Sequence, residues 1–214
     1  MSLNKPLDEA LKEGLAALHL ELPDSVRAQL LDYLGLLQKW NKTYNLTAIV
    51  EPERQLTHHL LDSLALLPYV SAGPLLDVGS GAGFPGLPLA LARPDLKVTL
   101  IDASQKKAAF MQQTAIELGL ARRVTVVHGR VEALQAGPFA QITARAFANL
   151  NDFVCLTRHV LAEGGCWLAM KGLYPHEEVT KLQEAVVCEE IELRVPGLEA
   201  QRHLLVLRPR AVEV

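Results

Sequence analysis

The sequence lacks the long apolar segments and the excess of one charge that would mark several classes of protein. It contains no run of about 18 apolar residues, the length that a membrane-spanning helix requires. Its first residues, MSLNKPLDEALKEG, carry charges early and have no apolar centre, so they do not resemble a secretory signal. We therefore expect a cytoplasmic protein with no membrane segment, folded around one sizeable core within 214 residues.

Cysteine is scarce and follows no spacing typical of a metal site or a disulfide framework. Cys155, Cys166 and Cys188 occur in the contexts VCL, GCW and VCE. An odd number of scattered cysteines is typical of reduced thiols. Nucleophilic cysteines of enzymes that methylate C5 of cytosine typically follow proline or threonine, so we expect these three to be buried structural residues.

The net charge of −3 argues weakly against a large nucleic-acid-binding surface, but it leaves room for a local basic patch. Taken singly, most basic residues are expected to be solvated surface charges. The candidates for a patch are Lys106, Lys107, Arg122, Arg123, Arg130, Arg145 and Lys171.

The spacing of the apolar residues changes near residue 70. Before it, apolar residues at helical spacing predict helices over 7–20, 25–40 and 57–70. After it, strand-like runs alternate with helical segments, which predicts an α/β fold: an open, mostly parallel sheet with helices on both faces. The expected strands are 74–79, 97–102, 123–129, 141–146, 165–172 and an antiparallel pair at 188–195 and 202–209, and the expected helices are 86–93, 104–119, 151–162 and 174–186. We therefore divide the chain into a helical N-terminal extension, residues 1–70, and an α/β domain, residues 71–214.

A glycine-rich loop, in LLDVGSGAGFPG, follows the first expected strand. Glycines such as Gly79, Gly81 and Gly83 let a backbone adopt positive φ and approach a ligand closely. In doubly wound sheets ligands bind at this place, outside the carboxyl ends of the strands. The G-x-G-x-G spacing departs from the dinucleotide pattern G-x-G-x-x-G, and Pro85 and Pro88 remove backbone donors that a pyrophosphate would use. The loop therefore disfavours a dehydrogenase, although structural turn glycines remain an alternative.

S-adenosylmethionine carries no phosphate, so it fits this loop better than a dinucleotide does. A bare backbone can lie against its methionine portion. Asp102 ends the second expected strand, about 20 residues after the loop, where a carboxylate commonly holds ribose hydroxyls. The loop and Asp102 together predict an S-adenosylmethionine site.

Five motifs in this order resemble the bacterial glucose-inhibited division protein B family of small-subunit ribosomal RNA methyltransferases: LLQKWNKTYNLTAI, HHLLDSLALLPY, LLDVGSGAGFPG, ARAFANL and MKG. The resemblance runs from about residue 25 to 208. It implies a class I S-adenosylmethionine-dependent methyltransferase, with a Rossmann-like seven-stranded sheet behind an extension that recognises RNA. It also implies methyl transfer to N7 of a guanosine in the 530-loop of 16S rRNA, presented as naked RNA, a 30S subunit or an assembly intermediate.

The resemblance further implies a set of contacts to the cofactor. Asp102 would hold the ribose hydroxyls, and Val131 and Glu132 would flank the adenine. Asp77 would steady the loop or reach the amino group of the cofactor, and Arg145 would face the methyl-transfer region. The whole implied set is Asp77, Gly79, Ser80, Gly81, Gly83, Phe84, Asp102, Ala103, Ser104, Val131, Glu132 and Arg145.

Guanine N7 carries a lone pair and no proton, so its methylation needs positioning and a dry site rather than a general base. Enzymes that methylate exocyclic amines resemble one another in an Asp/Asn-Pro-Pro-aromatic run, and this chain has TARAF in that place. We expect Arg145 to be the catalytic residue, gripping guanine O6 or a phosphate. A structural ion pair with a buried acid is the alternative role for this arginine.

N7 lies in the deep, narrow major groove of A-form RNA, so the target is expected in a loop or flipped out of a helix. The residues expected to bind this substrate are Asn41, Asn45, Asp62, Lys171 and Arg202. Structural capping is an equal alternative for the two asparagines, as solvation is for the two basic residues.

Other functions stay open on the sequence alone. A small-molecule methyltransferase could share this cofactor site, with the helical extension as a lid. His58, His59 and Asp62 form too small a set of ligands to favour a metal, so we expect none. Nothing in the sequence indicates an oligomer, and we expect a monomer.

Overall fold

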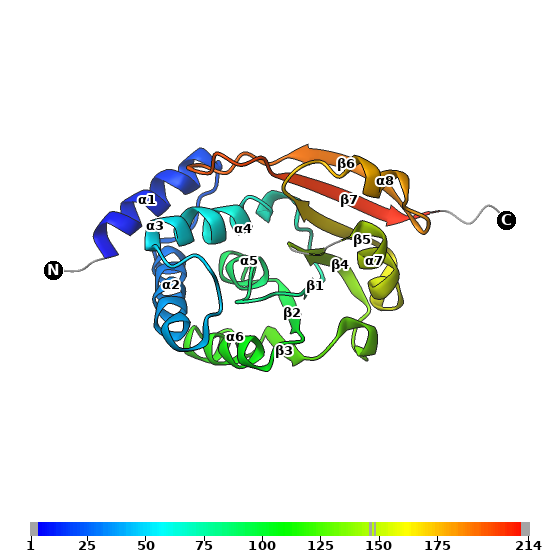
Figure 1. Ribbon diagram of the computed structural model, residues 1–214. Helices are drawn as coiled ribbons and strands as arrows, with labels where there is room; N and C mark the ends of the chain where they lie inside the picture. The colour runs from blue at the N-terminus through cyan, green and yellow to red at the C-terminus, as the bar shows by residue number, and fades with distance from the viewer. Residues whose placement is uncertain (1–3, 146, 148, 211–214) are drawn as a thin grey trace.

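The structure is a computed structural model that describes residues 4–145, 147 and 149–210. Its strands form one seven-stranded sheet in the order β3-β2-β1-β4-β5-β7-β6 (Figure 1). The first five are parallel, and β7 runs antiparallel to both β5 and β6. The strands are β1 Pro74–Val78, β2 Lys97–Asp102, β3 Val124–His128, β4 Phe139–Ala144, β5 Leu161–Lys171, β6 Ala185–Glu192 and β7 His203–Pro209. This confirms the predicted α/β, mostly parallel sheet and the terminal antiparallel pair; residue 146, the last of the strand expected at 141–146, lies outside the described residues.

Helices cover both faces of the sheet, and each face has its own apolar core. The helices are α1 Asn4–Ala17, α2 Asp24–Tyr44, α3 Pro52–Gln55, η1 Leu56–Leu61, α4 Asp62–Leu64, η2 Leu67–Tyr69, α5 Gly86–Ala92, α6 Gln105–Glu117, η3 Val131–Ala133, α7 Leu150–Thr157, η4 Arg158–Val160 and α8 His176–Thr180. Successive residues of a strand point to opposite faces, so Leu75 joins the core under α2, α5 and α6, while Leu76 joins the core under α7. None of the described helices is long and apolar enough to cross a membrane.

The helical extension shares the first of these cores with the α/β domain. Leu34 of α2 and Leu60 of η1 lie in the same buried cluster as Phe110 of α6. Tyr33 is fully buried, and its hydroxyl donates to the carbonyl oxygen of Ala82 at 2.6 Å. The extension is therefore packed directly against the glycine loop.

The strand order reverses at β1, with β2 on one side and β4 on the other. In an open α/β sheet this is the point where ligands bind, outside the carboxyl ends of the strands. The loops after β1, β2, β3 and β4 therefore surround the expected cofactor position.

The segment expected as a helix over 174–186 was predicted wrongly. Only His176–Thr180 is helical, and Ala185 already pairs with Pro209 at the start of β6. The apolar residues between 179 and 186 fit the period of a helix as well as that of a strand, and pairing with β7 favours the strand. In the same way Leu161, expected near the end of a helix, begins β5, because α7 ends at Thr157.

Three further details differ from expectation. Cys155 on α7 and Cys188 on the edge strand β6 are exposed, so only Cys166 is buried as predicted. Although Cys155 is exposed, partial desolvation of its sulfur and the carboxylates near it raise the pKa of its thiol, which does not suit a nucleophile. The helix expected over 57–70 starts at Pro52, and its Leu56–Leu61 part is a π-helix, a wide turn that is frequent at functional sites.

Candidate active site

The glycine loop leaves open space at the carboxyl end of β1. Gly79 and Gly81 have φ of 66° and 62°, the left-handed region that favours glycine. A Cβ added to either would have no atom within 4 Å, so both face room that a ligand can occupy. Gly83 also has a positive φ, 98°, but an added Cβ there would meet the side chain of Leu87. The first two glycines form a bare cradle, and the third is favoured by its backbone conformation and by its packing against Leu87.

Asp102 lies beside this cradle and holds its shape. Its carboxylate accepts the backbone N–H of Gly81 at 2.9 Å and that of Ser104 at 2.8 Å. A carboxylate has about four acceptor positions, so two remain for donors such as ribose hydroxyls. Ala103 and Ser104 follow directly, at the start of α6. The arrangement fits the ribose-holding role expected of Asp102.

Asp77 fixes the loop from below. It is fully buried, and its Oδ2 accepts the N–H of Gly86, the first residue of α5, at 2.9 Å. Its Oδ1 has no hydrogen-bond partner among the described residues. Burial raises the pKa of Asp77 to about 7, so the group titrates near neutrality. The hydroxyl of Ser80 donates to the carbonyl oxygen of Asp77, which ties the loop to β1.

The residues expected at the adenine follow β3 at the same edge of the sheet. Val131 is buried in the apolar core under α7, and Glu132 next to it is exposed. Both lie in the short helix η3. The position of Val131 fits an apolar contact with the adenine base, and that of Glu132 fits a polar contact at the edge of the base.

Arg145 follows β4 and lies over the end of the glycine loop. The carbon of its guanidinium is 5.1 Å from the centre of the Phe84 ring. Its Nη1 donates to the carbonyl oxygen of His58 at 3.1 Å and lies 3.5 Å from Oδ2 of Asp62. Arg145 thus connects the cofactor loop with the helical extension.

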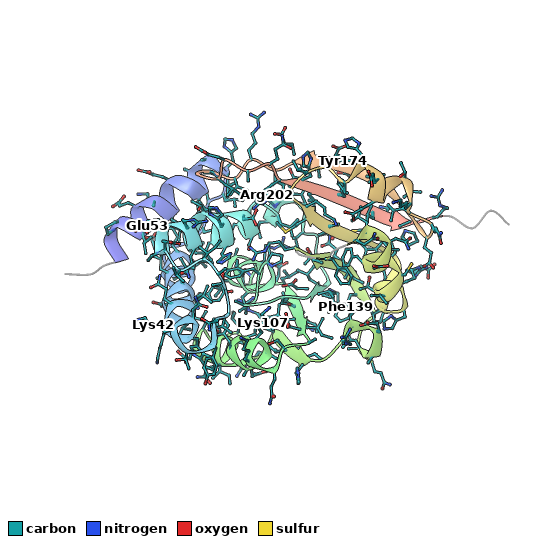
Figure 2. The ribbon with its side chains drawn as sticks, in the orientation of Figure 1. Lys42, Glu53, Lys107, Phe139, Tyr174 and Arg202 are labelled. Atoms are coloured by element: carbon teal, nitrogen blue, oxygen red, sulfur yellow. The ribbon has the colours of Figure 1, made fainter. Side chains whose placement is uncertain are left out.

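Asp62 joins two arginines that are far apart in the sequence. Its side chain is 3% exposed, and its Oδ1 accepts Nε of Arg202 at 2.9 Å. The side chains of Arg145 and Arg202 are 26% and 23% exposed. Figure 2 labels Arg202, which precedes β7 and reaches across to α4. The carboxylate therefore holds both guanidinium groups in fixed places and neutralises one of their charges.

These groups line a cavity of about 350 Å³, called here the arginine cavity. Its lining residues are Ile49, His58, His59, Asp62, Arg145, Met170, Lys171, Gly172 and Arg202. Lys171 belongs to it, although its Nζ also pairs with Glu178 at 2.8 Å and donates to the carbonyl oxygen of Phe147. The structure thus brings together Asp62, Arg145, Lys171 and Arg202.

Asn41 and Asn45 lie elsewhere and shape a loop. The side chain of Asn41 accepts the N–H of Thr47 at 2.9 Å and donates to its carbonyl oxygen at 3.0 Å. Asn45 ends α2 with φ of 48°, a left-handed conformation that asparagine tolerates. Both line a separate cleft on the far side of residues 45–50. The hydrogen bonds of Asn41 and the C-cap position of Asn45 fit the structural alternative, and their role in binding the substrate stays a prediction.

His59 connects this loop with the glycine loop, a role that the sequence did not suggest. Its ring stacks on Phe84 with centres 4.6 Å apart, and its Nε2 lies 2.9 Å from the hydroxyl of Thr47. Burial and the charge of Arg145 lower the pKa of His59 to about 4, so the ring is neutral. Its other ring nitrogen faces the carbonyl oxygen of His58 at 3.1 Å. Among the described residues no group of three or more metal-ligating side chains occurs.

Known proteins resemble this chain both in fold and in sequence. Two of the solved structures that match are TrmN from Thermus thermophilus and a SAM-dependent methyltransferase from Geobacter sulfurreducens in complex with S-adenosyl-L-homocysteine. The first has a TM-score of 0.57 and 17% identity over 81% of this chain and 53% of that one. The second has a TM-score of 0.53 and 17% identity over 82% and 98%. At this identity they establish the fold, that of class I S-adenosylmethionine-dependent methyltransferases.

Sequence relatives go further. A protein of Neisseria meningitidis serogroup C, named ribosomal RNA small subunit methyltransferase G, is 53% identical over 94% of this chain and 98% of its own length. A protein of the same name from Laribacter hongkongensis is 54% identical over the same shares. The family described as GidB, rRNA small subunit methyltransferase G, matches residues 26–205. These matches confirm the expected family: the chain belongs to the rRNA small subunit methyltransferase G family.

Proposed function

We propose that this protein transfers a methyl group from S-adenosylmethionine to N7 of a guanosine in the 530-loop of 16S rRNA. Membership of the family supports the reaction and the class of substrate. The structural observation that best supports this function is the contact of Arg145 with Phe84, because it places the arginine cavity directly beside the glycine loop. A base in the cavity and a cofactor in the cradle would then meet at these two side chains.

The described residues fit the cofactor. The bare backbone at Gly79 and Gly81 offers room for the methionine portion, and Asp102 has acceptor positions for ribose hydroxyls. The buried Oδ1 of Asp77 is an unmet acceptor below the loop, as an ammonium group or a water would require. When bound, S-adenosylmethionine supplies an electrophilic methyl group on its sulfonium sulfur.

The arginine cavity suits a guanine acceptor. Arg145 and Arg202 carry only hydrogen-bond donors, which match the O6 acceptor of guanine. N7 attacks with its own lone pair, so the chain needs no general base. His59 is neutral, yet both of its ring nitrogens already face protein oxygens, which agrees with a reaction that removes no proton. Since N7 gains a positive charge, the two arginines also favour release of the product.

The same geometry argues against a small-molecule methyltransferase whose extension acts as a lid. A lid must open, whereas the extension shares a buried core with α5 and α6. The hydrogen bond from Tyr33 to Ala82 further fixes α2 to the glycine loop. We also propose, as the sequence led us to expect, that one copy of the chain is the active unit; light scattering of the purified protein would test this.

Methylation of purified 16S rRNA tests the function directly. The protein would be incubated with methyl-labelled S-adenosylmethionine and, separately, naked 16S rRNA, 30S subunits and an assembly intermediate. Mass spectrometry of nuclease fragments is expected to find one labelled 7-methylguanosine in the 530-loop for at least one of these forms. Transfer to a panel of metabolites, with none to any of the RNAs, would overturn the proposal.

A further inference from the structure

A second, larger opening lies on the other side of residues 45–50 and shares Ser104 with the expected cofactor site. This cleft, called here the lysine cleft, has a volume of about 850 Å³. Its walls are the C-terminal end of α2, the 45–50 loop and the first turn of α6. Lys42, Lys106 and Lys107 line it, and none of the described lining residues is acidic. In a chain with a net charge of −3, this is a local excess of positive charge.

Two of these lysines stand where cations are unfavourable. Lys106 and Lys107 lie in the first turn of α6, at the positive end of the helix dipole, where carboxylates are preferred. Ser104 at the N-cap makes no side-chain capping bond that would offset this charge. The arrangement destabilises the isolated protein, and a bound anion would reverse the sign of the effect.

A buried amide provides independent evidence for a ligand. Gln55 is fully buried and belongs to the lining of the lysine cleft. Its Nε2 donates to the carbonyl oxygen of Ile49 at 2.8 Å, while its Oε1 has no hydrogen-bond partner among the described residues. A buried acceptor without a donor is unfavourable, so a ligand that brings an N–H or O–H group would satisfy it. The lysine cleft therefore suits a ligand that carries both anionic groups and a hydrogen-bond donor.

We propose that the lysine cleft binds the ribose–phosphate backbone of RNA beside the target nucleotide. This rests on the proposed function, which makes RNA the substrate. Phosphates would pair with Lys42 and Lys107, and a ribose hydroxyl or base amine would donate to Oε1 of Gln55. RNA carries both kinds of group along one strand.

The position of the cleft agrees with this occupant. Thr47 and Ala48 line the lysine cleft, and Ile49 of the same loop lines the arginine cavity. A single strand that crosses this loop would therefore reach both openings. Tyr44 at the end of α2 is 43% exposed and offers a ring on which a base can stack. Its carbonyl oxygen accepts Nζ of Lys106 at 2.6 Å, so Lys106 also ties the two walls together.

Replacing two lysines tests the proposal without disturbing that tie. The test variant is Lys42→Gln/Lys107→Gln, and Figure 2 labels both residues, on the neighbouring helices α2 and α6. The control is Lys12→Gln/Lys97→Gln, which also removes one lysine from the extension and one from the α/β domain, both outside the cleft. Binding of a 530-loop RNA would be measured by fluorescence anisotropy over a series of salt concentrations, together with cofactor binding by calorimetry.

Two lost phosphate contacts on a single strand lower the slope of log Kd against log salt by about 1.4 and weaken binding about 25-fold at roughly 0.1 M salt. We expect this loss for the test variant, and for the control variant the wild-type slope. Cofactor affinity is expected to stay unchanged in both. An unchanged slope in the test variant, or an equal loss in the control, would overturn the proposal.

A measurement on the wild-type chain covers the case in which the test variant fails to fold. Acetylation rates of individual lysines would be followed by mass spectrometry with and without the RNA. We expect protection of Lys42 and Lys107 relative to Lys12 and Lys97, and equal rates would contradict the cleft. If the wild-type protein methylates 16S rRNA but these lysines are unprotected, only this inference fails. If it methylates no RNA, the proposed function fails as well.

Discussion

The carboxylate of Asp62 offers the most informative perturbation of the site. It is buried and holds two arginines, from the loop after β4 and the segment before β7, against α4. Asp62→Asn keeps the size of the side chain but removes the charge. A hydrogen bond to a charged group contributes about 1.5–3 kcal/mol, and Asn can still accept one of the two bonds. The side chains of both arginines are about a quarter exposed, so water can partly replace the lost contacts. We therefore expect a loss of about 2–3 kcal/mol in the free energy of unfolding.

Urea unfolding and thermal melting measure this loss. For a chain of this size it corresponds to a fall in Tm of about 5–10 °C. The matched control is Glu51→Gln, which removes the charge from a single 3.5 Å contact with Arg54 in which the carboxylate is 52% exposed. An exposed pair contributes about 0–1 kcal/mol, so the control is expected to melt close to the wild type.

Methylation and cofactor binding complete the test. Asp62 does not line the glycine cradle, so cofactor affinity is expected to stay near the wild-type value, while kcat/KM for 16S rRNA falls at least tenfold as the guanidinium groups lose their fixed places. An Asp62→Asn protein as stable as the wild type, with unchanged kcat/KM, would refute the assignment of Asp62 as a positioning residue.

Three further predictions concern the cofactor loop. Gly81→Ala is expected to weaken S-adenosylmethionine binding by at least tenfold in calorimetry, because its Cβ would enter the cradle. The free energy of unfolding is expected to fall by only roughly 1–2 kcal/mol, the cost of a non-glycine residue at φ 62°. Tyr33→Phe is expected to lower the free energy of unfolding by about 1–2 kcal/mol, since it leaves the buried carbonyl of Ala82 without its donor; equal stability in urea would contradict the bond. Because the pKa of Asp77 is raised on folding, its contribution to the free energy of unfolding is largest below pH about 4 and is lost as pH rises toward about 7. Asp77→Asn should therefore flatten the dependence of stability on pH between these values. If urea unfolding at several pH values gave the same dependence for the variant and the wild type, the raised pKa of Asp77 would be contradicted.

Much of the fold could be predicted because its signals are local. The alternation of apolar runs and helical segments after residue 70 predicted the strands to within a few residues, and the bare loop with Asp102 predicted where a cofactor would lie. The boundaries failed where one apolar pattern suits two structures, as between Val179 and Val186. There the antiparallel partner β7, and not the local sequence, decides.

The arrangement of the arginine cavity could not be predicted in the same way. Asp62, Arg145 and Arg202 are each plausible as surface residues, and their contacts span 140 positions for Asp62 and Arg202. A π-helix places His59 against Phe84, and no residue pattern announces such a turn. Of the lysines in the cleft, Lys106 and Lys107 were predicted only as part of a general basic patch, and Lys42 was not predicted, because the sequence does not show that α2 and α6 face one another.

The central claim is that this chain makes one 7-methylguanosine in the 530-loop of 16S rRNA. Mass spectrometry of 16S rRNA from a strain that lacks the protein, compared with the same strain carrying the wild-type chain or its Asp102→Ala variant, tests it most directly. We predict that this one modification is absent without the protein, restored by the wild type and not by the variant. An unchanged modification map in the strain without the protein would contradict the claim.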